Sequence, residues 1–526
     1  MNQKIADLIF PSAKPTDYWT QKYPVRKTNA FRYAPSPTGY LHVGGLGMAL
    51  ACRFLATNNK GILFLRVEDT DQKREIEGAT ELLVAALDEF GITFDEGFDG
   101  KKNKGKYAPY RQSDRTEIYQ AFAKKLLIDG NAYPCFCSAE DITKIREEQA
   151  GKKQEIGYHG KYARCAGLSV EEIEKLVKDK KEFVIRFNPD KTREVERIEW
   201  NDDIRGKMSL PAINNHPVII KSNGLPPYNF AHVVDDFLMG TSHVLRGEEW
   251  LPSTAEHIQI AEATLGAITW SYGHMPVITI MDDGGKRKLS KRKDKCALAD
   301  NLLQEGYPKQ AVIEYLLTLY NGDFEKWRLQ NPDAGYTQFN FRFEKIGTNN
   351  PLFDIKKLEH ISREIISKKT KKQINDAVTE YLAKYNPQSR GVMEKIFGIL
   401  AIDRESPKPR KDIAKYSEIL TEYDYMITRP NISVDRGQQT IALEFLQTFN
   451  IKDDRETWFE KIKVVAKKLG YADNMKDYKN NPAAYKGSIG DVTQSIRLMV
   501  TGKPNTPDLY EIMKVLGNDE VRTRLK

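Results

Sequence analysis

The chain has 526 residues, a length that predicts several domains rather than a single core. Hydrophobic residues make up 40% and charged residues 29%, values typical of a globular protein that exclude a disordered chain. The formal net charge of +8 permits nucleic-acid binding without requiring it.

The first part of the chain predicts an extension followed by half of an α/β domain. Residues 1–29 are polar with a few aromatic side chains, and we interpret them as an N-terminal extension. The elements that follow are a strand at 30–34, a Pro/Ser/Gly turn at 35–39, a helix ending near Gly61, an apolar strand at 62–67 and a helix at 74–90. This order is typical of the first half of a doubly wound nucleotide-binding fold, here residues 30–125.

After residue 125 the predicted secondary structure changes character twice. Residues 126–225, with a strand at 183–187, predict an inserted α+β module. Residues 226–295 return to α/β character and predict the second half of the split parallel sheet. The elements expected there are a strand at 243–246, a helix at 253–264 and a strand at 277–281. Residues 296–345 are interpreted as a linker region, and residues 346–526 as an all-α region.

The segment 34–45, APSPTGYLHVGG, predicts a phosphate-binding turn. Gly44 and Gly45 open a helix whose free N–H groups and positive dipole end suit a triphosphate. His42 can donate a hydrogen bond to a phosphate oxygen. An isolated H-x-G-G motif is more often a turn with a buried structural histidine, so a second signal is needed.

That second signal is KLSKR at 288–292, after the second α/β half. Alone, such a string is usually a solvated basic loop. In this position Lys288 and Lys291 can contact triphosphate charge as pyrophosphate departs. The sequence has no Walker-type motif, which argues against a P-loop enzyme.

Together the two segments resemble the HIGH and KMSKS motifs of class I aminoacyl-tRNA synthetases. Gly45 stands where HIGH has its second histidine, a departure typical of the glutamyl branch. The resemblance implies ATP binding by His42, Gly44 and Gly45. It also implies stabilisation of the pyrophosphate side by Lys291, with help from Lys288.

Further segments resemble glutamyl-tRNA synthetases in particular. RVEDTD at 66–71 matches their R-I-E-D-T-D, in which the glutaminyl branch usually has aspartate at the position of Glu68. Residues 227–240 and 243–250 are also similar. The resemblance places Glu249 near the adenosine and Glu68 at the substrate ammonium group. It implies that the glutamate is bordered by Arg32, Ser36, Tyr228 and Arg246, and by His232, which stands where the family commonly has asparagine.

Each arginine taken alone is more often a surface or ion-paired residue. A site with an arginine fork rejects glutamine, however, because the buried charge would stay unpaired, at a cost of about 3–5 kcal/mol.

The resemblance implies a bacterial-type glutamate–tRNA ligase that uses ATP and Mg²⁺ to form glutamyl-adenylate. Transfer then goes to the 3′-terminal adenosine of tRNA(Glu), through its 2′-hydroxyl. The glutamyl branch usually needs tRNA bound before activation. Catalysis requires positioning and charge stabilisation rather than a protein nucleophile.

Cys135, Cys137 and Cys165 are similar to a zinc site found in the inserted module of some glutamyl enzymes. A closed zinc site needs four ligands, and Tyr158, His159 or Tyr162 could supply the fourth. The alternative is three reduced cysteines in a module without metal.

The remaining expectations concern partners and surroundings. By resemblance the inserted module grips the acceptor stem and the helical region binds the anticodon; a monomer is the family expectation. No apolar run is long enough for a membrane span, and the five cysteines are an odd number, so we expect a cytoplasmic protein. Glutaminyl-tRNA synthetase and a non-catalytic tRNA-binding paralogue are the alternatives, and charging of tRNA(Gln) stays open.

Overall fold

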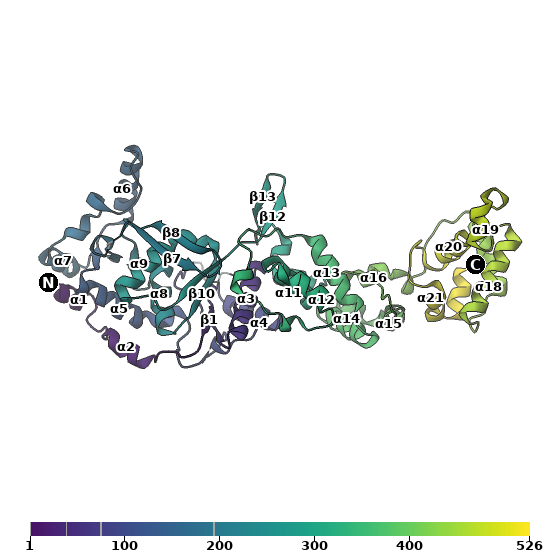
Figure 1. Ribbon diagram of the computed structural model, residues 1–526, viewed down its shortest axis with the longest axis horizontal. Coiled ribbons are helices and arrows are strands. Elements are labelled where there is room, and N and C mark those ends of the chain that lie inside the picture. Colours follow the sequence, from purple (N-terminus) through teal and green to yellow (C-terminus); the bar gives the residue numbers. More distant parts are fainter. Residues whose placement is uncertain (1, 38, 74–75, 193–194) are drawn as a thin grey trace. The chain divides into compact units, whose positions relative to one another are not determined.

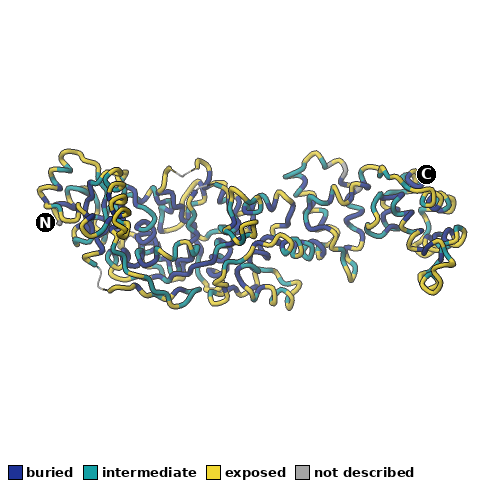
Figure 2. The backbone as a smooth tube through the Cα atoms, turned by 90° about the horizontal axis from the view of Figure 1, so that it is seen from above, coloured by how far each residue is buried: buried dark blue, intermediate teal, exposed yellow. Residues whose placement is uncertain are grey.

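The computed structural model describes residues 2–37, 39–73, 76–192 and 195–526, which divide into two compact units (Figure 1). The first unit comprises Met1–Asn301 and Ile313–Asp354, and the second Leu302–Val312 and Ile355–Lys526. Buried residues run through the interior of both (Figure 2), and each has a hydrophobic core of its own. Within the described ranges, no helix combines the length and apolar character that crossing a membrane requires.

An eight-stranded sheet forms the centre of the first unit, with strand order β4-β3-β2-β1-β10-β11-β7-β8. Its strands are β1 (Ala30–Tyr33), β2 (Ile62–Leu65), β3 (Glu96–Phe98), β4 (Asn103–Lys104), β7 (Arg197–Asp202), β8 (Gly206–Pro211), β10 (His243–Gly247) and β11 (Ser271–Met275). The six inner strands run parallel, while β4 and β8 at the two edges are antiparallel to their neighbours.

The sheet is assembled from two stretches of chain that are far apart in sequence. Phe31 on β1 pairs with His243 on β10, and Ala30 N donates a 2.9 Å hydrogen bond to Ser242 Oγ. The predicted α/β core, with its split parallel sheet, is therefore confirmed. From the junction between β1 and β10 the chain continues to β2 on one side and to β11 on the other. In sheets of this kind, ligands bind beyond the carboxyl ends of the strands at such a switch point.

Helices of the first unit occupy the predicted places with shifted ends. The helix expected before Gly61 is α3 (Val43–Asn58), which packs against β1, β2 and β10. The helix expected at 74–90 is α4 (Ala79–Glu89), which begins after Gly78, whose φ of 75° is not helical. Residues 74 and 75 lie outside the described residues. The helices α5 (Thr116–Asp129), α8 (Tyr228–Leu238) and α9 (Thr254–Leu265) pack against one another.

The strand expected at 277–281 differs from the one observed. β12 (Thr279–Asp282) pairs with β13 (Gly285–Lys288) in a two-stranded hairpin that is separate from the main sheet, and Thr279 also forms a parallel bridge with Leu352. The main sheet is continued instead by β11, which the sequence analysis missed. The β11 residues Ser-Tyr-Gly-His-Met lack the β-branched side chains that indicate a strand.

Residues 126–225 contribute to two sheets. β5 (Ala132–Cys135), β6 (Val184–Phe187) and β9 (Val218–Ile220) form a three-stranded antiparallel sheet. The helices α6 (Ala139–Gly151) and α7 (Val170–Lys178) each begin with a serine capping box. The hairpin β7–β8 lies in the same range of sequence but joins the main sheet, through pairing of Tyr272 with Asp202.

The N-terminal extension is part of the core rather than an appendage. α1 (Asn2–Ile9) packs against α5 and α7, and Lys124 on α5 pairs with Asp7 at 2.7 Å. α2 (Thr16–Lys22) follows, and Trp19 in it is 5% exposed. Beyond it, Arg26 donates two hydrogen bonds to the Glu96 carboxylate on β3, at 3.1 and 2.8 Å.

Helices also form the rest of the chain. α10 (Ala299–Gln304), α11 (Lys309–Tyr320) and α12 (Asp323–Gln330) follow the β12–β13 hairpin. The remaining helices are α13 (Ile355–Ser367), α14 (Lys371–Tyr385), α15 (Met393–Ala401), α16 (Ile419–Glu422), α17 (Arg436–Thr448), α18 (Arg455–Leu469), α19 (Met475–Asn480), α20 (Ile489–Thr501), α21 (Leu509–Leu516) and α22 (Asn518–Arg524). The predicted all-α region is confirmed. The second unit also takes in residues 302–312, since Gly306 O accepts a hydrogen bond from Tyr416 N at 2.9 Å.

Trp19→Ala tests the structural role of the extension. We expect the free energy of unfolding to fall by about 3 kcal/mol, because a large buried side chain is replaced by a cavity. Denaturant unfolding of the whole chain measures it. Tyr18→Ala, at a neighbouring side chain that is 42% exposed, is the matched control and should cost under about 1 kcal/mol. Equal losses in the two variants would contradict this role.

Candidate functional site

Three arginine side chains are buried at the carboxyl ends of the central strands. Arg32 lies on β1, Arg66 directly follows β2 and Arg246 lies on β10, and none is more than 5% exposed. A guanidinium group taken out of water is strongly destabilising unless acceptors surround it. The partners of these three arginines therefore define the chemistry of the site.

Asp236 on α8 is the acceptor shared by two of them. Its Oδ1 atom accepts hydrogen bonds from Arg32 Nε at 3.1 Å and from Arg66 Nη1 at 2.7 Å, and its Oδ2 atom accepts one from His232 Nδ1 at 3.1 Å. Burial acts to raise the pKa of Asp236, but Arg32 and Arg66 hold it well below its usual range. Asp236 is therefore a carboxylate that organises both arginines.

The adjacent Asp235 binds a further buried arginine and a tyrosine. It accepts hydrogen bonds from Arg115 Nε at 2.6 Å and from Tyr119 Oη at 2.8 Å. On the other side, Arg66 Nη2 donates to Glu68 Oε1 at 2.9 Å. Arg32, Arg66 and Arg115 thus each contact at least one carboxylate directly.

Arg246 is different, because all of its direct partners are neutral. Its Nε atom donates to His274 Nε2, Nη1 to His257 Nδ1 and Nη2 to Thr254 Oγ1, each at 2.9 Å, and Tyr228 Oη lies 3.4 Å from Nη1. In the part of the chain that the structure describes, no carboxylate oxygen lies within 4 Å of this guanidinium. Burial lowers the pKa of both His257 and His274, which keeps the two imidazoles uncharged near neutral pH.

His232 lies between these two groups. Its ring stacks on Tyr228, with ring centroids 4.9 Å apart. Because the Asp236 carboxylate can only accept, His232 Nδ1 carries the hydrogen and Nε2 presents a lone pair. Nε2 is buried and has no hydrogen-bond partner among the described residues. Burial lowers the pKa of His232 to about 4, although the bond to Asp236 acts in the opposite direction.

The predicted phosphate-binding turn lies at the start of α3. His42 is the N-cap residue, and its Nδ1 atom accepts a 2.9 Å hydrogen bond from Gly44 N. A Cβ atom on Gly44 would lie 3.0 Å from the His42 ring, and one on Gly45 would lie 3.0 Å from Tyr33 Oη. Burial, assisted by the nearby Lys291, lowers the pKa of His42 to about 4, so its imidazole is neutral with Nε2 as the donor.

The lysine-rich segment lies beside this turn. Lys291 Nζ donates a 2.6 Å hydrogen bond to Tyr40 O, two residues before His42. Lys288 Nζ lies 3.5 Å from Glu249 Oε1, and His42 pairs with Leu298 in a short antiparallel bridge. Lys291 therefore lies beside the turn that carries His42, close enough for its charge to lower the pKa of the imidazole.

The structure thus brings the predicted residues together in two groups of the first unit. The first group contains Arg32, Glu68, Tyr228, His232 and Arg246; the second contains His42, Gly44, Gly45, Glu249, Lys288 and Lys291. Ser36 is exposed in the turn after β1, where Glu68 N donates to Pro35 O at 3.0 Å. Thr38, in the same turn, lies outside the described residues.

Sequence reasoning missed the residues that hold the arginines. Asp235, Asp236, His257 and His274 are each completely buried, and none was assigned a role. A signal was present for two of them. Two consecutive aspartates within the apolar helix Tyr228–Leu238 must have buried partners if that helix packs in a core.

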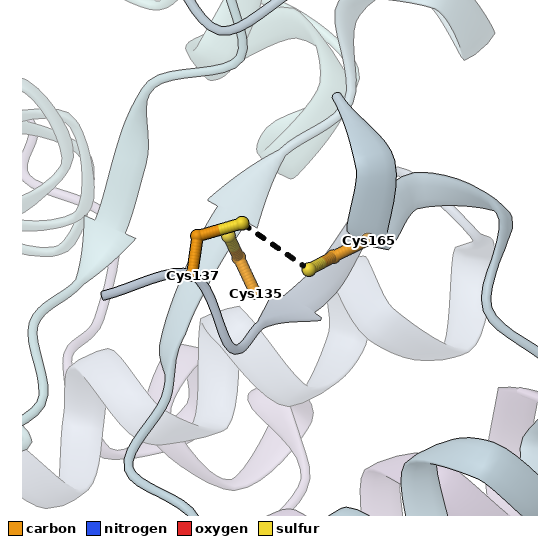
Figure 3. Close-up of side chains that lie close together, drawn as sticks. All are labelled: Cys135, Cys137 and Cys165. Carbon is orange, nitrogen blue, oxygen red and sulfur yellow. Dashed lines mark hydrogen bonds between the residues drawn. The ribbon is translucent and has the colours of Figure 1, made fainter. Parts of the chain in front are cut away.

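Three cysteines at and near the end of β5 form a separate cluster (Figure 3). Cys135, Cys137 and Cys165 have sulfur atoms within 4.8 Å of one another, and the Cys137 and Cys165 Sγ atoms are 3.7 Å apart. Tyr158 Oη lies 3.3 Å from Cys135 Sγ and 3.2 Å from Cys137 Sγ.

The other two residues considered as a fourth ligand bond elsewhere. His159 Nε2 lies 3.2 Å from Glu155 O, and Tyr162 Oη donates to Gln154 Oε1 at 2.8 Å. Of the three candidates, Tyr158 is the one whose oxygen reaches the sulfur atoms.

Two family models match the chain. Residues 30–360 match the model described as tRNA synthetases class I (E and Q), catalytic domain, and residues 472–526 match an anticodon binding domain. The first match covers both groups of site residues.

Curated relatives and solved structures agree with these matches. The chain is 41% identical to the glutamate–tRNA ligase of Clostridium perfringens, covering 100% of this chain and 99% of that one. It is 39% identical to that of Acetivibrio thermocellus, with coverage of 100% and 99%. A crystal structure of a glutamate tRNA ligase from Elizabethkingia meningosepticum in complex with its amino acid is similar at a TM-score of 0.77. That pair is 27% identical, over 95% of this chain and 98% of the other.

The pKa of His232 predicts how stability depends on pH. A histidine whose pKa is lowered in the folded state stabilises fully above its unfolded pKa of about 6.5, and this stability is lost as the pH falls towards 4. We expect His232→Asn to reduce that loss by up to about 3 kcal/mol. Denaturant unfolding of both proteins between pH 7 and pH 4.5 measures it. Parallel pH profiles for wild type and variant would contradict the prediction.

Proposed function

Because the chain belongs to the class I tRNA synthetases of the E and Q type, we propose that it is a glutamate–tRNA ligase. It activates L-glutamate with ATP to glutamyl-adenylate and transfers the glutamyl group to the 3′-terminal adenosine of tRNA(Glu). The observation that carries the choice of glutamate is Arg246, a buried guanidinium group with only neutral partners.

Arg246 favours glutamate over glutamine on physical grounds. The side-chain carboxylate of glutamate supplies the missing negative charge, and its two oxygens suit a planar guanidinium fork. The amide of glutamine would fill the same space and leave the buried charge unmatched. Loss of a partner from a buried charge pair costs about 3–5 kcal/mol, which corresponds to a factor of hundreds to thousands in binding.

The other members of the first group, together with Ser36, complete the amino-acid site in this proposal. Glu68 accepts the substrate ammonium group, while Arg32, Ser36 and Tyr228 border the substrate. His232 replaces the asparagine common in the family and offers the lone pair on Nε2 as an acceptor. Asp236 keeps Arg32 and His232 in place.

The second group is proposed to bind ATP. Gly44 and Gly45, at the start of α3, leave room for the phosphates beside the N-terminus of the helix, where the Gly44 N–H is already bonded to His42 Nδ1. Glu249 lies near the adenosine. The neutral His42 donates from Nε2 to a phosphate oxygen. Lys291 and Lys288 stabilise charge on the departing pyrophosphate, and Mg²⁺ enters as the ATP complex to neutralise phosphate charge.

No protein nucleophile is needed for this reaction. The α-carboxylate of glutamate attacks the α-phosphorus of ATP in line and displaces pyrophosphate. The 2′-hydroxyl of the terminal adenosine then attacks the carbonyl carbon of the adenylate, forms the ester and releases AMP. The residues of the two groups act by orienting the reactants and by stabilising developing negative charge.

The remaining regions are proposed to bind tRNA. Residues 126–225 hold the acceptor stem, residues 296–345 contact the stem, and residues 346–526, which include the matched anticodon binding domain, bind the anticodon. We propose that the ligase is a cytoplasmic monomer.

The cysteine cluster is proposed to bind one structural zinc ion. Sulfur atoms around tetrahedral zinc are separated by about 3.8 Å, close to the 3.7 Å between Cys137 and Cys165. The Tyr158 oxygen completes a set of four donors. When bound, zinc would crosslink β5 to the segment around Cys165, and the three thiolates with Tyr158 would hold it.

Arg246→Ala tests the amino-acid assignment. We expect glutamate-dependent pyrophosphate exchange, measured with tRNA present, to fall at least a hundredfold, because the carboxylate partner is lost. Arg53→Ala removes an arginine on α3 that pairs with Asp95 outside both groups, and it should leave exchange unchanged. Normal exchange in Arg246→Ala would refute the assignment.

Cys165→Ser tests the zinc proposal. We expect elemental analysis of extensively dialysed protein to give about one zinc per wild-type chain and a large loss in the variant. Cys296→Ser, at a cysteine outside the cluster, should retain the metal. Wild-type protein that holds no zinc after growth in zinc-supplemented medium would disprove the proposal.

A further inference from the structure

Arg246 is linked through His274 to a carboxylate on a third strand. His274 Nε2 lies 2.9 Å from Arg246 Nε, and His274 Nδ1 lies 2.5 Å from Asp202 Oδ2. The three residues come from the neighbouring parallel strands β10, β11 and β7, and Arg246 is the register partner of His274. All three are almost completely buried, so water does not compete for these bonds.

The direction of each hydrogen bond in this chain is determined. Arginine Nε can only donate, so His274 Nε2 must accept. In a neutral imidazole the other nitrogen then carries the hydrogen, and His274 Nδ1 donates to Asp202. Burial lowers the pKa of His274, with Asp202 acting in the opposite direction, and this is consistent with the neutral form.

The Asp202 carboxylate is fixed by its second oxygen. Oδ1 accepts hydrogen bonds from the backbone N–H groups of Ile204 at 3.1 Å, Arg205 at 3.0 Å and His274 at 3.2 Å. Oδ2 is therefore the oxygen that faces the imidazole, and the side chain cannot rotate without breaking three bonds.

We propose that Asp202 and His274 are positioning residues that hold the Arg246 guanidinium for glutamate while leaving its charge without a direct carboxylate partner. The inference rests on the proposed function and extends it. Neither residue contacts the substrate: Asp202 sets the tautomer of His274, and His274 holds Nε of Arg246.

The interposed imidazole explains how one arginine can be both fixed and available. A carboxylate bonded directly to Arg246 would hold it equally well, as Asp236 holds Arg32, but it would also neutralise the fork. An imidazole supplies an acceptor without a negative charge. The substrate carboxylate then remains the favoured direct counter-ion, and glutamine gains no such advantage.

Asp202→Asn tests the inference with almost no change of shape. The three backbone donors require an oxygen at the Oδ1 position, so the new NH₂ group replaces Oδ2 and donates to His274 Nδ1. The imidazole must then carry its hydrogen on Nε2, opposite the Arg246 Nε–H donor. We expect the KM for glutamate in tRNA-dependent pyrophosphate exchange to rise about tenfold to a hundredfold. The KM for ATP should stay within about twofold, since His42 and Lys291 do not contact this chain of bonds.

Asp203→Asn is the matched control. Asp203 is the next residue, and its carboxylate accepts a hydrogen bond from Ser271 Oγ rather than from His274. This variant should keep the wild-type KM for glutamate. Wild-type exchange with glutamate tests the proposed function by itself, so its failure is distinguishable from failure of the positioning inference.

Substitutions of His274 separate positioning from packing. The Gln amide can reach the His274 Nε2 position and offer Arg246 an acceptor, whereas the shorter Asn amide reaches only towards Asp202. We expect His274→Gln to recover most of the glutamate binding that His274→Ala loses, and His274→Asn to recover little.

The inference is overturned by a KM for glutamate within twofold of wild type in Asp202→Asn. It is also overturned by equal rises in the KM values for glutamate and ATP, or by equal recovery in His274→Gln and His274→Asn. The last two results would indicate a merely structural role.

Discussion

Arginine cannot be left without acceptors in a protein interior, and this constraint shapes the centre of the first unit. Four guanidinium groups are buried in this region, those of Arg32, Arg66, Arg115 and Arg246. Two consecutive aspartates on α8 accept hydrogen bonds from the first three. Because α8 directly precedes β10, the same segment that completes the sheet also delivers the charges that hold Arg32 and Arg66. Arg246 is the exception, because its direct partners are all neutral. Where every neighbouring arginine has a carboxylate, the one that has none identifies the place for an acidic ligand.

Much of this arrangement could be predicted from sequence. The glycine-rich segment 34–45 and the lysine-rich segment 288–292 together indicate a nucleotide site, although neither does so alone. The alternation of apolar strands and amphipathic helices predicted the split sheet. The elements at 30–34, 62–67 and 243–246 follow directly from side-chain patterns. The sequence analysis expected Arg32, Glu68, Tyr228, His232 and Arg246 to lie close together. The structure links Arg32, Glu68 and His232 through Asp236 and Arg66, and Tyr228 both contacts Arg246 and stacks on His232.

What sequence could not supply is pairing between distant segments. β11 has no strand-like composition, and its position follows from the register with β10 rather than from its own residues. Asp202 lies in the range that the sequence pattern predicts as an inserted module, but its hairpin pairs with the edge of the main sheet. The sequence near Asp202 therefore gives no sign that it lies close to Arg246. The same holds for the N-terminal helices, whose apolar side chains are too few to indicate where they pack. Among the candidates for a fourth ligand beside the cysteines, only side-chain direction distinguishes Tyr158.

The pairing of β1 with β10 also affects how the protein is made. Ala30 and Ser242 are 212 positions apart, and closing so long a loop must precede the native contacts that stabilise it. On the ribosome, β1 therefore emerges long before β10, one of its two neighbours in the sheet, has been translated. The edge of β1 that pairs with β10 stays unpaired until β10 has been translated. An unpaired strand edge can mispair or bind chaperones.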